Sequence, residues 1–130
     1  MNKSANPSVF GFVMVVGVAV SMLAIVGCPA GGEPGANEVF IRAIAFDPPE
    51  ITIQVGETVT WNNRDIVPHT ATSGNPGDQD MGAIFRSVIL LQGDTFTHTF
   101  NEAGEFIYFC EVHPVMMRNA KVIVEGQASP

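Results

Sequence analysis

From Glu38 onward, apolar and polar residues alternate in short stretches, and no long stretch shows the 3.6-residue period of a helix. A period of two predicts strands that bury one face. The apolar positions of the pattern are Ile51, Ile53, Val55, Val59, Trp61, Phe96, Phe100, Val122 and Val124. Glycine turns separate the stretches, because glycine tolerates the positive φ of tight reversals. The pattern predicts an all-β fold, an antiparallel Greek-key β-sandwich of about seven or eight strands.

The first part of the chain has a different pattern, an apolar run from Val9 to Val26 that follows a segment carrying Lys3. A run of this length behind a basic residue is typical of a secretory signal. Ile25-Val26-Gly27-Cys28 resembles a bacterial lipobox, in which the cysteine is lipidated after cleavage. We therefore expect a lipoprotein signal peptide over residues 1–27 and lipidation of Cys28. An uncleaved membrane anchor is the alternative interpretation.

Glycine and proline dominate the segment that follows Cys28, and they predict a flexible tether over residues 28–37. The strand pattern then defines one small domain over residues 38–126, with a short tail at 127–130. With the lipobox, this order predicts an exported protein that is lipid-anchored to a bacterial membrane. Its domain would face the periplasm or the cell exterior.

Acidic residues outnumber basic ones, thirteen to six. Lys3 lies in the predicted signal, so the mature protein would keep five basic residues and a net charge of −8. Such a balance argues against nucleic acid as a partner and favours proteins with a basic face. We expect a monomer that meets these partners in weak, salt-sensitive encounters.

One cluster near the end of the chain carries the most informative chemistry. Between Cys110 and Met117 lie a thiol, the imidazole of His113 and the thioethers of Met116 and Met117. Thiolate and thioether are soft ligands, and a His₂Cys site with a weak axial Met is the composition of a blue-copper electron-transfer centre. The second histidine must come from elsewhere, and His69 is the candidate. His98 alternates in phase with Phe96 and Phe100, which predicts a structural role.

Cysteine usage supports a metal site. Lipid explains Cys28, which leaves Cys110 as an unpaired thiol in an oxidising compartment, and metal ligation gives such a thiol a reason to exist. The Tyr108-Phe109-Cys110 corner has no partner cysteine before Trp61, as an immunoglobulin domain would require. Zinc in recombinant protein, and a plain protein-binding sandwich without metal, remain alternatives.

Several segments, in this order, resemble the cupredoxins, especially their plastocyanin and amicyanin branch. The segments are Phe46-Asp47-Pro48-Pro49-Glu50-Ile51, Val55-Gly56-Glu57-Thr58-Val59-Thr60-Trp61, Pro68-His69-Thr70, Phe96 to Phe109 and Cys110-Glu111-Val112-His113-Pro114-Val115-Met116. The resemblance implies one copper ion that cycles between Cu(I) and Cu(II). The implied ligands are His69, Cys110, His113 and Met116, with Met117 as the alternative axial ligand.

The resemblance also implies which residues support the ligands. Thr70 stands where relatives often have an asparagine that bridges the two ligand loops, and its amide is within reach of the Cys110 sulfur. Asn62 is the second residue that we expect to support the ligands. The loop after Met116 is longer than in amicyanin and lacks the usual glycine, so the choice of Met stays open.

The implied function is single-electron transfer between larger redox proteins, not catalysis. Electrons would pass through the edge of His113 within an apolar patch formed by Pro68, Pro114, Val115 and the methionine that does not bind, Met117 if Met116 is the ligand. A c-type cytochrome with a basic face would suit the acidic surface. The alternative is a copper storage or delivery protein that hands Cu(I) to an oxidase.

Overall fold

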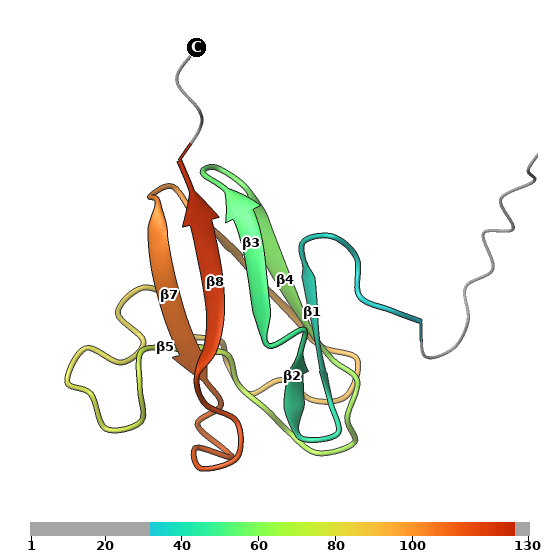
Figure 1. Cartoon of the computed structure of the whole chain (residues 1–130). Coiled ribbons are helices and arrows are strands. Elements are labelled where there is room, and N and C mark those ends of the chain that lie inside the picture. Colours follow the sequence, from blue (N-terminus) through green and yellow to red (C-terminus); the bar gives the residue numbers. More distant parts are fainter. Residues whose placement is uncertain (1–31, 127–130) are drawn as a thin grey trace, which may run out of the picture. The chain divides into compact units, whose positions relative to one another are not determined.

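The computed structural model of the chain describes residues 32–126 (Figure 1). The predicted signal peptide, the lipidation site at Cys28 and the tail at 127–130 lie outside these described residues. Within 32–126, no helix is long and apolar enough to cross a membrane.

In the described part of the chain, eight strands form two four-stranded sheets that pack face to face, which confirms the predicted all-β sandwich. The strands are β1 (Glu38–Arg42), β2 (Ala45–Asp47), β3 (Glu50–Gln54), β4 (Thr58–Asn63), β5 (Thr72–Ser73), β6 (Thr95–Thr99), β7 (Gly104–Phe109) and β8 (Ala120–Glu125). One sheet has the order β2-β1-β4-β6 and the other has the order β3-β8-β7-β5.

Both sheets are mixed, which differs from the antiparallel pairing that we expected. β1 runs parallel to β4, and β3 runs parallel to β8. The parallel pairs arise because the chain passes from β2 to β3 through Pro48 and Pro49, and so moves to the other sheet without reversing. A period-two pattern reports which face a strand buries and carries no information on strand direction.

Glycine turns reverse the chain where the sequence predicted. Gly56 and Gly93 have φ values of 91° and 89°, in the left-handed region that other residues adopt only with strain. The Gly56 turn joins β3 to β4 and is closed by a hydrogen bond from the Glu57 amide to the Gln54 carbonyl (3.1 Å). This turn sets the direction of β4, whose far end leads to His69.

Aromatic rings fill the space between the sheets. Trp61 on β4 is fully buried, and its ring lies 5.0 Å from that of Phe85 and 5.5 Å, edge to face, from that of Tyr108. Each such ring buries about 150–250 Å² of apolar surface, which makes this cluster a large part of the stabilising burial. Cys110 belongs to the same core, so the predicted site lies at one end of the hydrophobic interior.

His98 on β6 is half-buried between two aromatic side chains, as its phase with Phe96 predicted. Its ring lies 5.3 Å from that of Phe85 and 4.7 Å from that of Phe100. Burial lowers the pKa of this imidazole. As the pH falls through the ordinary histidine pKa, the unfolded chain therefore binds a proton that the folded chain resists, and the free energy of unfolding decreases.

We predict that His98→Phe reduces the loss of stability between about pH 7 and pH 5, because Phe keeps the aromatic packing and cannot titrate. Urea unfolding of the copper-free protein at both pH values measures the loss. An equal loss in both proteins would show that His98 contributes nothing to the pH dependence.

Candidate metal centre

Three of the predicted ligands meet at one end of the sandwich. His69 lies in the segment between β4 and β5, where its amide and carbonyl pair with Leu90 (3.1 and 2.8 Å). Cys110 follows β7 directly, and His113 lies three residues further along the same loop. His69 and Cys110 are fully buried and His113 is half-buried. Strand pairing therefore brings together residues that are 41 positions apart.

The spacing of the donor atoms suits a single metal ion. The Cys110 Sγ lies 3.6 Å from His69 Nδ1 and 3.8 Å from His113 Nδ1, and the three atoms are all within 4.8 Å of one another. Metal–nitrogen bonds of about 2.0 Å and metal–sulfur bonds of about 2.3 Å, at angles of roughly 110–120°, put each nitrogen roughly 3.5–3.7 Å from the sulfur. The side chains fit an ion bound by one thiolate and two imidazoles.

The orientation of His69 is set by a carboxylate that the sequence reasoning missed. Asp65 Oδ2 accepts a hydrogen bond from His69 Nε2 (2.9 Å), which leaves Nδ1 unprotonated and facing Cys110. Burial lowers the pKa of His69, and it outweighs the opposing effect of Asp65. A neutral imidazole with a free Nδ1 is the form that binds a metal.

Asp65 also holds a strained turn between β1 and β2. Its Oδ1 accepts from the Ala43 amide (2.7 Å) and its Oδ2 accepts from the Ile44 amide (2.9 Å). Ala43 and Ile44 have φ values of 53° and 54°, a conformation that costs about 1–2 kcal/mol per residue outside glycine. Burial acts to raise the pKa of Asp65, but the hydrogen bonds from Ile44, His69 and Ala43 outweigh it and hold the pKa low. The carboxylate thus stays charged and fixed.

The ligand loop is a hydrogen-bonded turn closed by Cys110 and Met117. The Cys110 amide donates to the Met117 carbonyl (2.9 Å), and the Met117 amide donates to the His113 carbonyl (2.9 Å). This turn points the two methionines in different directions. Met117 is 2% exposed and packs in the core that contains Cys110, whereas Met116 is 69% exposed.

The Cys110 sulfur receives the backbone contact that we expected from Thr70. The Thr70 amide lies 3.3 Å from the sulfur. The Thr70 hydroxyl accepts from the Glu111 amide (2.8 Å), so Thr70 bridges the two ligand segments.

Asn63, and not Asn62 as we expected, makes the hydrogen bonds that support the segment carrying His69. The Asn62 side chain donates to Glu38 (3.3 Å), away from the ligands. Asn63 is fully buried, and its amide group donates to the Val67 and Leu90 carbonyls (3.0 and 2.8 Å) and accepts from the Asp65 amide (2.9 Å). The alternation of Val59 and Trp61 along β4 continues to Asn63, so the period-two pattern contained this signal.

Exposed or half-buried apolar residues flank His69 and His113 along the chain, and they form the apolar surface discussed below. Val115 is 77% exposed, Pro68 is exposed and Pro114 is half-buried. Met116 is exposed like Val115, whereas Met117, which we expected in the patch, is buried.

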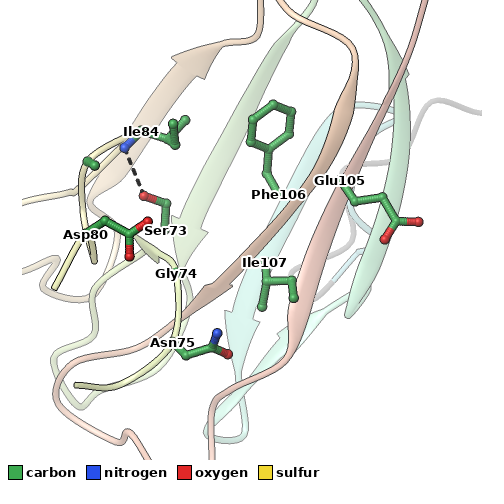
Figure 2. A pocket seen from close by; sticks show the side chains of 9 residues that line it. Ser73, Gly74, Asn75, Asp80, Ile84, Glu105, Phe106 and Ile107 are labelled. Carbon is green, nitrogen blue, oxygen red and sulfur yellow. Dashed lines mark hydrogen bonds between the residues drawn. The ribbon is translucent and has the colours of Figure 1, made fainter. Parts of the chain in front are cut away.

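An open hollow of about 250 Å³ lies elsewhere, between the loop after β5 and strand β7 (Figure 2). Asp80 and Glu105 contribute carboxylates to its lining, and Ser73 Oγ accepts a hydrogen bond from the Ile84 amide (3.1 Å). None of the lining residues is a histidine or a cysteine, so the hollow has no soft-metal donors.

A β-sandwich that brings one cysteine sulfur and two imidazoles together at one end defines a blue-copper class of protein. Residues 35–125 match the sequence model of a protein family, the copper binding proteins of the plastocyanin/azurin family. The chain belongs to this family, which binds one copper ion, and His69, Cys110 and His113 are the candidate ligands.

Individual relatives agree with this assignment. Amicyanin from Paracoccus versutus is 39% identical over 89 residues, which is 67% of this chain and 63% of that protein. The chain thus spans less than two thirds of that amicyanin. Plastocyanin from Tetradesmus obliquus is 32% identical over 127 residues, covering 93% of this chain and 86% of that protein. The solved structure of a purple cupredoxin from Nitrosopumilus maritimus aligns with a TM-score of 0.59 and 33% identity, over 68% of this chain and 98% of that one.

We predict that Asp65→Asn lowers copper affinity by about 10–100-fold, the usual cost of removing a carboxylate that orients a ligating histidine. Asn offers one acceptor oxygen where Asp65 uses two, so the His69 contact and the turn compete for it. A chelator competition titration measures the affinity.

Asp94→Asn is the matched control for this prediction, because Asp94 accepts from the Leu91 amide (2.9 Å) and contacts no ligand. Equal affinities for Asp65→Asn and Asp94→Asn would show that Asp65 does not orient His69.

Proposed function

We propose that the protein is a type 1 copper protein that carries single electrons between redox partners. The observation that carries this proposal is the set of one cysteine sulfur and two imidazoles, two of the three side chains fully buried, at spacings that suit one ion. When bound, copper supplies the Cu(I)/Cu(II) couple. The role of the chain is to hold the donors, exclude water and provide a short path to the surface.

Two of the three ligand side chains are held by hydrogen bonds that do not depend on a metal. Asp65 fixes the His69 ring, and the Thr70 amide fixes the Cys110 sulfur. Donors that are held in place move little between oxidation states, which favours fast electron exchange. His113 is the least buried of the three ligands, so its ring edge is the proposed exit to the apolar surface around Val115 and Met116.

For the axial position, burial favours Met117 over Met116. A weak axial thioether must reach a site that is closed to water, and Met117 is buried in the same core as Cys110. Met116 is exposed within the proposed exit surface. We therefore propose Met117 as the axial ligand, in place of the Met116 favoured by motif spacing.

Charge supports a partner with a basic face, such as a c-type cytochrome. A net charge of −8 on the mature protein attracts such a partner and makes the association rate depend on salt. We further propose that Cys28 carries lipid, which would keep the carrier at a bacterial membrane, with its domain in the periplasm or at the cell exterior. A monomer suits short encounters of this kind.

Copper delivery is the second candidate, and one observation favours it. The exposed Met116 thioether in the ligand loop is a soft donor that could receive Cu(I) at the surface. A carrier keeps its copper through many redox cycles, whereas a delivery protein gives it to an acceptor.

We predict that the Cu(II)-loaded protein has an intense visible thiolate-to-copper band, which Cys110→Ser abolishes because serine has no sulfur to donate the charge. Repeated reduction by a c-type cytochrome and reoxidation should leave the band undiminished, with rates that fall as ionic strength rises. Absence of the band from the unmodified protein would overturn the blue-copper proposal. Loss of copper during cycling would favour delivery.

We predict that Met117→Leu raises the reduction potential, because Leu has a similar volume and offers no donor to Cu(II). Met116→Leu is the matched control and should change the potential little. Voltammetry of both variants measures the shifts, and a larger shift for Met116→Leu would return the axial position to Met116.

A further inference from the structure

A closed ring of hydrogen bonds begins and ends at Glu111, the residue that follows Cys110. The Glu111 amide donates to Thr70 Oγ1 (2.8 Å), Thr70 Oγ1 lies 3.3 Å from Thr72 Oγ1, and Thr72 Oγ1 donates to Glu111 Oε1 (2.6 Å). Thr70 and Thr72 are buried, at 5% and 0% exposure. Water therefore has little access to the two hydroxyls.

The carboxylate decides the direction of every bond in this ring. An ionised Glu111 only accepts, so the Thr72 hydroxyl donates to it. The Thr72 oxygen then accepts from the Thr70 hydroxyl, whose own oxygen accepts from the Glu111 amide. Each buried hydroxyl donates once and accepts once, and the loss of one member would leave another unpaired.

Arg86 holds the carboxylate from the outer side. Its Nε donates to Glu111 Oε1 (2.7 Å) and its Nη2 donates to Oε2 (2.6 Å), the two-pronged geometry of the stronger ion pairs. Arg86 also faces Thr72 across an isolated β-bridge. The segment that carries Arg86 continues to Leu90, which pairs with His69. The ring is thus tied to both ligand segments.

We propose that Glu111, held by Arg86, is a positioning residue that keeps the Thr70 amide against the Cys110 sulfur and so sets the reduction potential. The inference rests on the proposed copper function. The Thr70 amide is 3.3 Å from the sulfur, and hydrogen bonding around this sulfur is one of the features that tune such sites. The sequence gives no sign of this role, because Glu111 is not a ligand and Arg86 lies 25 residues before it.

Two variants release the ring in different ways. Thr72→Val removes its central hydroxyl without changing charge. Glu111→Gln keeps the shape of the side chain, but its amide NH₂ faces the Arg86 guanidinium. The matched control is Glu105→Gln, which removes the same charge from the ion pair with Lys121 (3.4 Å) on the sheet surface.

In the copper-free protein, we expect Thr72→Val and Glu111→Gln to speed hydrogen exchange at the Thr70 and Glu111 amides by about tenfold, and Glu105→Gln to leave it unchanged. With copper bound, Thr72→Val should lower the potential, because it changes no charge and a weaker hydrogen bond to the sulfur stabilises the reduced site less. Removal of negative charge acts in the opposite direction, so Glu105→Gln should raise the potential slightly, and Glu111→Gln, which combines both effects, is judged by hydrogen exchange.

Unchanged exchange at both amides, or a Thr72→Val potential that does not fall, would overturn the positioning role. The exchange measurement needs no copper, so it stays informative if the blue-copper band is absent. Failure of the proposed function and failure of this inference are therefore separable.

Discussion

The hydrogen bond from the Thr70 amide to the Cys110 sulfur joins the two segments that carry the ligands. These residues are 40 positions apart, and the bond lies in a fully buried environment. The Thr70 amide is the backbone donor at this sulfur, and the Nδ1 atoms of His69 and His113 lie 3.6 and 3.8 Å from it. The position of His69, the course of the ligand loop and the Glu111 ring all depend on the two segments being in contact at this point.

Carboxylates build this site without entering the ligand set. Asp65 accepts three hydrogen bonds from His69 and the β1–β2 turn, and Glu111 accepts from Thr72 and Arg86. The Arg86 hydrogen bond, which outweighs burial, lowers the pKa of Glu111, and the Thr72 hydroxyl adds to the effect. Both carboxylates therefore remain charged and occupied by protein donors. A hard oxygen ligand would favour other metals, so this arrangement helps to keep the site soft.

The parts of the fold and site that could be predicted are those with local causes. Alternating residues such as Val59 and Trp61 marked strands, and Gly56 and Gly93 marked reversals, because period and φ are local properties. The parallel pairing of β1 with β4 could not be predicted, because it depends on a crossing between sheets. Two choices differed by one residue: Asn63 supports the His69 segment where Asn62 was expected, and Met117 is buried where Met116 was favoured.

Residue chemistry in the sequence determined which kind of ion the protein can bind, because one cysteine, two histidines and nearby methionines form a soft donor set whatever the fold. The strand pattern also determined that an all-β sandwich would carry this set. Only the tertiary structure decided which methionine faces the core, since a hydrogen-bonded turn from Cys110 to Met117 sets the direction of each side chain. It also brought Asp65 to His69 and Arg86 to Glu111, because long-range strand pairing, not spacing along the chain, decides which polar groups meet.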